Sequence, residues 1–307
     1  MAQAVDQHLH HSQRPMLALI LRLGAALMLA IMMVLVKLAS ESGVHLIEIV
    51  FWRQLPTIPI LLLWFWARKS LASLRTERLK AHGVRALYGI ISLFLNFAGV
   101  TLLPLAEATV FTFTSTIWAV ILSAILLGER IGLWRWSAVF LGFAGVLVIA
   151  QPGDGHIPLI GAACSLSAAF VIGLISIQIR DLGRTEQPLT TVFYFAMFCV
   201  PLLAPLMPFV MTGHSPYQWS LLAGMGATGL ACQFLLVSAL RLGTVASVTV
   251  MDYSGLIWAA LFGAVIFDRL PSAATWIGAP LVISAGVLIA WREHRLAVER
   301  AQSAASV

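Results

Sequence analysis

The hydrophobic positions of this chain form long continuous runs of about 20 residues, separated by short polar stretches. A helix of about 20 apolar residues crosses a hydrocarbon core of ~30 Å, so each run predicts one membrane span. Outer-membrane barrels alternate apolar and polar positions, and the continuous runs exclude that class. The ten predicted spans cover residues 16–39, 45–67, 84–103, 105–127, 133–150, 157–179, 189–211, 218–241, 244–267 and 273–291.

The connections between these spans are too short to hold a soluble domain. The first span is too long for the apolar core of a cleavable signal peptide, so we expect an uncleaved signal anchor. Residues 1–15 and 292–307 are polar, and we expect both to be disordered tails.

The second half of the chain repeats part of the first in weakened form. The run that Pro104-Leu105-Ala106-Glu107-Ala108 opens ends in Gly128-Glu129-Arg130, and the run after Gly243-Thr244-Val245-Ala246-Ser247 ends in Phe267-Asp268-Arg269. The two acidic–Arg pairs are 139 residues apart. Duplicated halves, here 16–150 and 157–291, are typical of transporters whose substrate site forms where the repeats meet.

Composition and charge agree with a membrane protein. Hydrophobic residues make up 60% of the chain, charged residues 10%, and the mean hydropathy is +0.93. The net charge of +6 does not indicate a nucleic-acid partner, because most of the basic residues lie in the loops and tails on one side of the membrane. With the N-terminus in the cytoplasm, fifteen basic residues lie inside and only Arg269 lies outside. Because each half has five spans, the second half enters from the opposite face, which predicts an inverted repeat.

Few residues of this chain are arranged as catalysis or metal binding would require. Cys164, Cys199 and Cys232 each fall singly inside an apolar span, where a thiol is usually a packing residue. The eight histidines lie in tails, loops or span ends, without a zinc or nucleotide motif. We therefore expect no cofactor, no resident metal and no enzyme activity.

Several short motifs resemble those of the drug/metabolite transporter superfamily. They are Phe51-Trp52-Arg53, Leu127-Gly128-Glu129-Arg130, Gly142-Phe143-Ala144-Gly145, Asp268-Arg269 and Ser284-Ala285-Gly286, in order on a frame of two five-span copies. The chain is similar to EamA-type members, although Asp268 stands where that type more often has Glu. The resemblance implies an all-α fold and secondary transport of small metabolites, commonly amino-acid export across a bacterial cytoplasmic membrane.

Ionisable groups within the spans are the strongest site candidates, because charge in lipid is costly. Asp252 lies ~12 Å into the ninth span at 1.5 Å per residue, opposite Phe113 in the repeat. We interpret it either as a proton-coupling or substrate-amine site, or as half of a structural ion pair with Arg53. Arg53 lies at a similar depth in the second span, entered from outside.

Three charged residues near the outer ends are candidate gates. Glu107 and Glu48 each lie at the start of a span, where an acid also suits a helix N-terminus. Lys37 ends the first span and could reach the headgroups, or pair with Glu41 or Glu48.

Aromatic and amide side chains near the midplane complete the candidate site. Trp118 and Trp258 lie one residue apart in the repeat alignment, and either line a central cavity or pack between helices or against lipid. Asn96 and Gln233 are also near-equivalent, and Tyr253 follows Asp252. Intramembrane amides usually bond across helices, so a substrate contact is the alternative.

We therefore expect a multi-pass inner-membrane transporter with both termini in the cytoplasm. It would move amino acids or related compounds outward by alternating access, driven by a proton or a counter-substrate, as a monomer or weak dimer. A passive channel and a membrane-embedded lipid-modifying enzyme are the alternatives.

Overall fold

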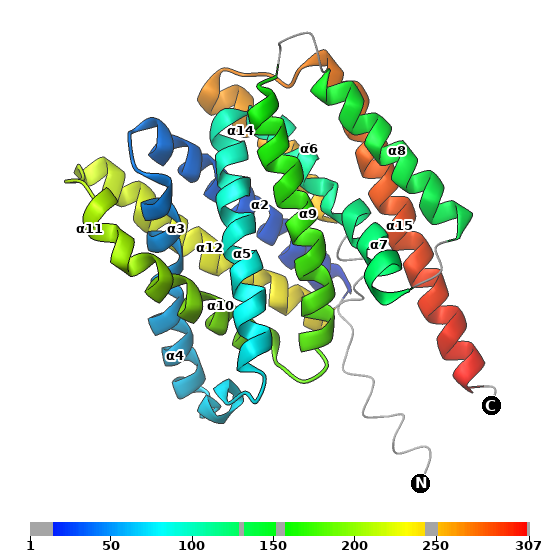
Figure 1. The fold of residues 1–307 in the computed structure, drawn as a ribbon, viewed down its shortest axis with the longest axis horizontal. Helices are drawn as coiled ribbons and strands as arrows, with labels where there is room; N and C mark the ends of the chain where they lie inside the picture. The colour runs from blue at the N-terminus through cyan, green and yellow to red at the C-terminus, as the bar shows by residue number, and fades with distance from the viewer. Residues whose placement is uncertain (1–14, 129–131, 152–156, 243–250, 306–307) are drawn as a thin grey trace.

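Every regular element in the described part of the chain is helical. The computed structural model describes residues 15–128, 132–151, 157–242 and 251–305 (Figure 1). The first half of the chain contains α2 (Pro15–Glu41), α3 (Leu46–Gln54), α4 (Thr57–Ala67), η1 (Leu71–Leu74), α5 (Leu79–Leu102), α6 (Leu105–Phe113), α7 (Ser115–Leu127) and α8 (Leu133–Ala150). The second contains α9 (Leu159–Leu182), α10 (Pro188–Leu203), η2 (Ala204–Leu206), α11 (Met207–Val210), α12 (Pro216–Leu242), η3 (Met251–Ser254), α14 (Gly255–Phe267) and α15 (Ala273–Ala305).

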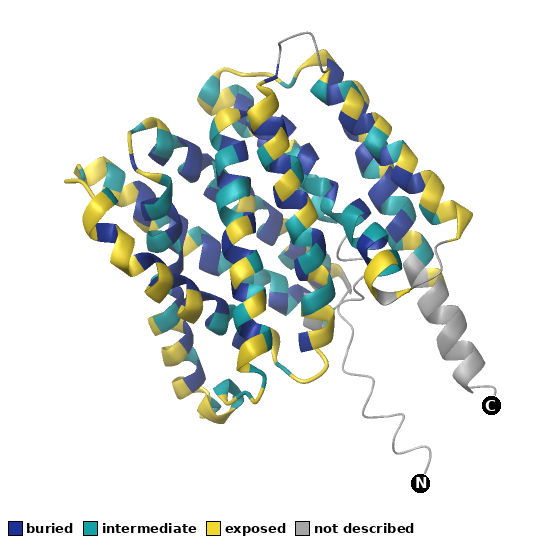
Figure 2. Cartoon of the chain, viewed as in Figure 1, coloured by how far each residue is buried: buried dark blue, intermediate teal, exposed yellow. Residues whose placement is uncertain are grey.

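The predicted spans agree with these helices. Among the described residues, nine helical segments are long and apolar enough to cross a membrane, and Met251–Phe267 is a shorter apolar helix. That segment belongs to the predicted ninth span, whose first residues, 244–250, lie outside the described part. The chain is thus an all-α, multi-pass membrane protein. Figure 2 shows exposed positions along the outward sides of the helices, where large apolar side chains would meet lipid.

Two predicted boundaries differ from the structure. The third span begins at Leu79 and not at 84, so His82 belongs to the helix, and its side chain is buried within the bundle. The expected disorder of 292–307 is wrong as far as Ala305, because α15 continues that far. Ala, Leu, Glu and Arg, which dominate this stretch, are strong helix formers and can extend a helix into water. The expected N-terminal tail lies outside the described residues, apart from Pro15.

The closest helix packing joins the two halves of the chain. Helix α2 packs on α12, α5 on α9, and α8 on α15, and Figure 1 shows the last pair running side by side. Helix association in lipid depends on close packing, and small residues permit it. At Gly145 of α8, an added Cβ would lie 2.7 Å from the carbonyl oxygen of Gly278 in α15, so these backbones touch.

Two spans are interrupted at corresponding places. One breaks between α6 and α7 at Thr114, whose hydroxyl donates to the Phe111 carbonyl at 2.6 Å. The other breaks between η3 and α14 at Ser254, whose hydroxyl donates to Met251 at 2.6 Å. Discontinuous helices in matching positions of two halves are a feature of transporter binding sites.

The matched breaks correct the predicted repeat register by one residue. Thr114 and Ser254 are 140 residues apart, as are Gly128 and Asp268, which both end their helices in the left-handed conformation. In this register Trp118 corresponds to Trp258, and Phe113 corresponds to Tyr253 and not to Asp252.

Candidate functional site

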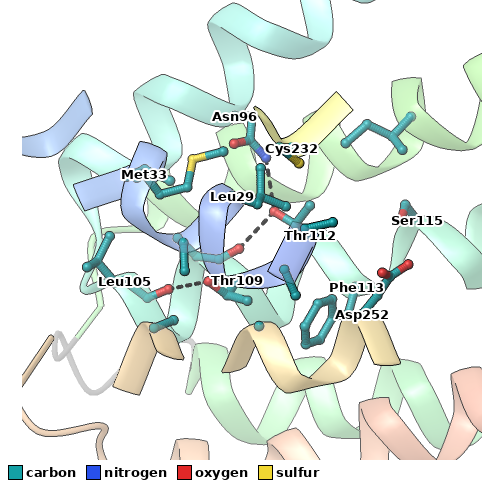
Figure 3. Close-up of a pocket in the computed structure, with 18 of the residues that line it drawn as sticks. Leu29, Met33, Asn96, Leu105, Thr109, Thr112, Phe113, Ser115, Cys232 and Asp252 are labelled. Atoms are coloured by element: carbon teal, nitrogen blue, oxygen red, sulfur yellow. Dashed lines mark hydrogen bonds between the residues drawn. The ribbon is translucent and has the colours of Figure 1, made fainter. Parts of the chain in front are cut away.

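A cavity of about 310 Å³ lies between the two halves, next to both helix breaks. Residues of α2, α5 and α6 line it from the first half, and residues of α12, η3 and α14 from the second (Figure 3). Most of its wall is apolar. Its polar side chains are Arg22, Asn96, Thr109, Thr112, Ser115 and Asp252.

An ion pair in the cavity wall joins the two halves. The Nε of Arg22 lies 2.5 Å from Oδ1 of Asp252, and Nη2 lies 2.5 Å from Oδ2. Such two-point contacts between guanidinium and carboxylate are strong and directional. The Arg22 side chain is 9% exposed and that of Asp252 is 39% exposed, so the carboxylate is the half that the cavity can reach.

The predicted partnership between Asp252 and Arg53 is wrong. Arg53 lies in α3, where Nη1 contacts the side chain of Gln54 at 2.8 Å and Nε contacts the sulfur of Met32 at 3.2 Å. No carboxylate among the described residues contacts it. Arg22 and Asp252 both lie several residues after the start of an odd-numbered predicted span, the first and the ninth, whereas Arg53 lies after the start of the second span, which runs in the opposite direction. This shared depth was the sequence signal for the true partner.

On a different part of the wall, Asn96 of α5 contacts α6. Its Nδ2 donates to the hydroxyl of Thr112 at 3.1 Å, and that hydroxyl donates to the Ala108 carbonyl at 2.9 Å (Figure 3). The Oδ1 of Asn96 is buried without a partner among the described residues and can accept a hydrogen bond. Gln233, its predicted counterpart, is half-buried in α12 and does not line the cavity.

Neither predicted tryptophan lines this cavity. Trp118 packs edge-on against Phe143 and Phe170, with both pairs of ring centroids 5.2 Å apart. Trp258 stacks on Phe262 at 6.4 Å. Trp118 therefore packs between helices, which was the alternative interpretation of the sequence, whereas the ring that Trp258 contacts belongs to its own helix, α14.

Tyr253, the remaining midplane candidate, packs its ring edge-on against Phe113, which does line the cavity. Tyr253 itself is not among the lining residues.

Lys37 is buried near the C-terminal end of α2, one helical turn from the cavity, and its ammonium group is bonded within the protein. It follows Met33, a cavity residue, by one turn of α2, and it lines a second hollow of about 600 Å³ with Asp268 and Arg269. Its Nζ donates to the Leu103 carbonyl at 2.5 Å and lies 5.3 Å from the centre of the Phe267 ring. The expected ion pairs of Lys37 with Glu41 or Glu48 are absent at bonding distance in the described structure.

The two candidate glutamates connect the halves of the chain at buried sites. Glu107 of α6 accepts hydrogen bonds from the Ser272 N–H at 3.1 Å and the Thr275 hydroxyl at 2.8 Å, at the N-terminus of α15. Glu48 of α3 contacts His214, with Oε2 2.5 Å from Nε2. The expectation that both acids lie at a helix N-terminus is confirmed, because Glu48 and Glu107 lie in the first turns of α3 and α6; Glu107 also contacts the N-terminus of α15.

A bundle of membrane helices with a small cavity between its halves, an ion pair in the cavity wall and two broken helices beside it defines a membrane transporter. The model of the EamA-like transporter family matches this chain twice, over residues 16–151 and 159–291. The chain therefore belongs to the EamA-like transporter family, within the drug/metabolite transporter superfamily, and it is not an enzyme.

Named relatives transport different metabolites. The chain is 28% identical over 86% of its length to the pseudopaline exporter CntI of Pseudomonas aeruginosa, of which it covers 93%. It is 30% identical to a riboflavin transporter of Rhizobium johnstonii, over 75% of this chain and 76% of that one. It is 26% identical to an S-adenosylmethionine uptake transporter of Rickettsia prowazekii, over 83% and 86%.

A solved crystal structure supports the fold. It superposes with a TM-score of 0.60 at 21% sequence identity, covering 91% of this chain and 98% of its own. This likeness concerns the fold alone.

Proposed function

We propose that this protein is a secondary active transporter that exports amino acids or related small metabolites across the bacterial cytoplasmic membrane by alternating access. The cavity between the two halves is the substrate site. The halves are inverted repeats, and both termini face the cytoplasm.

The observation that carries this proposal is the Arg22–Asp252 pair in the wall of a mostly apolar cavity. A compound with an ammonium and a carboxylate group can replace each partner of the pair, while its side chain contacts the apolar wall. Asn96 and Thr112 supply neutral hydrogen bonds elsewhere on the wall. The cavity volume of about 310 Å³ suits a small metabolite. The export direction has the support of one relative, the pseudopaline exporter.

Counterflow in proteoliposomes tests the transport activity. Vesicles loaded with each unlabelled amino acid in turn should accumulate the same labelled compound transiently and saturably for at least one of them. A passive channel would equilibrate the label without saturation or overshoot. Asp252→Asn should abolish binding or gradient-driven accumulation, whereas Glu77→Gln, an exposed loop acid with no part in the cavity, should leave both unchanged. If both variants transport like the unmodified protein, the cavity is not the substrate site.

The driving force is a proton gradient or a counter-substrate. Accumulation in vesicles with an imposed pH difference, with and without internal substrate, distinguishes the two. Proton coupling requires accumulation without internal substrate.

The orientation can be tested with single cysteines. Arg75→Cys lies in the loop between α4 and α5, and Leu270→Cys lies in the exposed loop before α15. Leu270 is preferable to Ser272, whose N–H contacts Glu107. An impermeant reagent outside the cytoplasmic membrane should label Leu270→Cys and not Arg75→Cys. The reverse pattern would contradict the proposed orientation.

A further inference from the structure

Two buried histidine–glutamate pairs join the halves of the protein. In the first, which we call the outer pair, Nε2 of His214 lies 2.5 Å from Oε2 of Glu48, and the side chains are 0% and 1% exposed. In the second, the inner pair, Nε2 of His82 lies 3.7 Å from Oε1 of Glu186, and the side chains are 0% and 7% exposed.

The two pairs occupy corresponding places in the chain. Glu48 lies in the first turn of α3, and Glu186 lies just before α10, which are the second helices of their halves. His214 lies just before α12, and His82 lies in the first turn of α5, which are the third helices. Each glutamate therefore meets the histidine of the other half. Such reciprocal contacts between the halves are expected when a pair of residues is present in both copies of an inverted repeat.

Corresponding aromatic rings surround both pairs. The ring of His214 packs edge-on against Trp219, with centroids 5.2 Å apart, and Trp219 packs on Trp52 at 4.9 Å. The ring of His82 stacks on Tyr194 at 4.5 Å. Trp52 and Tyr194 belong to the second helical span of their respective halves; Glu48 lies in that span of the first half, and Glu186 lies just before that span of the second half. The resemblance thus extends beyond the ionisable groups.

The pairs lie at opposite ends of the bundle. The span Leu46–Ala67, which begins beside Glu48, leads to the loop that precedes His82. Its 22 residues rise about 33 Å at 1.5 Å per residue, which is the thickness of the hydrocarbon core. Figure 1 shows α3 and α4 following one another from one end of the bundle to the other.

The contacts of the two pairs differ in this structure. The outer pair is in direct contact. In the inner pair the Thr76 hydroxyl donates to Oε1 of Glu186 at 2.5 Å, and neither ring nitrogen of His82 has a hydrogen bond among the described residues. Other charged or titratable groups near His82 are Arg78, Arg85 and Tyr194. Glu48 is the charged group that contacts His214.

Proton occupancy controls how strongly such a pair holds. An imidazole and a carboxylate that share a proton attract each other, and removal of that proton leaves a buried carboxylate without its donor. Histidine is the side chain whose ordinary titration lies near neutral pH. A pair at each end of an alternating-access protein can therefore make the opening of that end depend on protons.

We propose that the outer and inner pairs are proton-binding sites that tie the two halves together, one at each end of the transport path. A proton held by a pair keeps that end closed, and its loss lets the end open. Because the outer pair is in contact and the inner pair is parted, the two sites hold protons alternately in the cycle. This inference rests on the proposed alternating access and adds the sites that would link it to protons.

Distances between spin labels test the proposal in the purified full-length protein. One label pair, Glu41→Cys with Thr212→Cys, reports the outer end, and another, Glu77→Cys with Arg184→Cys, reports the inner end; all four positions are exposed. The background carries alanine at the three native cysteines and must first retain the Tm of the unmodified protein in detergent. Between pH 5 and pH 8, both distance distributions should shift.

Single substitutions should separate the two ends. His214→Gln should remove the pH response of the outer labels and leave that of the inner labels, and His82→Gln should do the opposite. Glu48→Gln, which resembles a permanently protonated acid, should hold the outer end closed at pH 8. His45→Asn is the matched control, since His45 is an exposed histidine that caps α3 beside the outer pair, and it should change neither response.

Persistence of both pH responses in the two histidine variants would overturn the proposal, as would simultaneous loss of both responses in either one. Counterflow and amino-acid binding are measured on the same samples. If no amino acid is transported while the label responses follow the expected pattern, the proposed substrate class fails and the proton sites stand. If amino acids are transported normally and the label responses are unaffected by the histidine substitutions, the proposed substrate class stands and the proton sites fail.

Discussion

The rings of Phe113 and Tyr253 pack edge to face, with centroids 4.9 Å apart and an interplanar angle of 79°. Each residue directly precedes the hydroxyl residue that marks a helix break, Thr114 in the first half and Ser254 in the second. Corresponding residues of two repeats can meet only near the axis that relates them. The contact therefore places the pseudo-twofold axis of the proposed inverted repeat next to the cavity.

This contact depends on the absence of a side chain at Gly286. A Cβ there would lie 1.5 Å from the hydroxyl oxygen of Tyr253, so Gly286→Ala must displace the tyrosine. Overpacking of this kind costs about 1–3 kcal/mol, and we expect a lower Tm in detergent. Gly213→Ala, in the loop before α12 where an added Cβ meets no atom within 4 Å, is the control and should not lower the Tm. Equal Tm values for the two variants would contradict the observed packing.

The Arg22–Asp252 pair makes a specific prediction about double variants. Asp252→Asn leaves the buried guanidinium without its carboxylate and should destabilise the protein by about 1–3 kcal/mol. Adding Arg22→Gln should recover part of this loss, because it removes the unpaired charge. Adding Arg53→Gln should not, since Arg53 does not contact Asp252. Thermal unfolding of the single and double variants measures the coupling, and rescue by Arg53→Gln alone would restore the pairing predicted from the sequence.

The Oδ1 of Asn96, which has no partner among the described residues, should contribute to substrate affinity by accepting a hydrogen bond from the substrate. Asn96→Leu removes an unpaired acceptor at the cavity wall, and the loss of one hydrogen bond of about 1 kcal/mol should raise the apparent KM about fivefold. Gln233→Leu is the matched control, because Gln233 lies outside the cavity wall and should give an unchanged KM. Both values come from initial rates of counterflow. An equal effect of the two variants would argue against the position of the site.

Lys37 should limit access to the cavity from the outer side. Lys37→Met loses the hydrogen bond to the Leu103 carbonyl, whereas Lys37→Arg can keep it. Cys232 lines the cavity and is a native reporter, so its modification by a small thiol reagent should become several-fold faster in Lys37→Met. Mass spectrometry of the labelled peptide measures the rate without interference from the other thiols. An unchanged rate would exclude Lys37 as a gate.

The sequence predicted how far along its span each residue lies better than it predicted which way the side chain points around the helix. Span positions follow from the lengths of apolar runs, and most predicted spans agree with the helices. The partner of Asp252 was wrong because depth alone does not state which way a side chain points around its helix. For the same reason the sequence left open whether Trp118 and Trp258 line the cavity or pack elsewhere, and in the structure their rings pack on Phe143, Phe170 and Phe262.

The helix breaks and the histidine–glutamate pairs could not be predicted from the pattern of any one apolar run. The interruption at Thr114 has no glycine or proline beside it, and although Gly255 follows Ser254, a single glycine within an apolar run does not predict a break; hydroxyl residues within spans usually bond to the helix backbone without breaking it. The histidine–glutamate pairs join residues that are more than 100 positions apart, so they emerge only when the halves pack.

The contact between Gly145 and Gly278 limits how this protein can move. A Cβ at Gly278 would lie 2.6 Å from the Gly145 carbonyl oxygen, so the two backbones exclude any side chain between them. Sliding α8 along α15 would bring side chains of the neighbouring turns into this space and separate the helices. The two fifth helices are therefore a fixed frame of reference, and covalent crosslinking of α8 to α15 should leave the rearrangement of the remaining helices free to proceed.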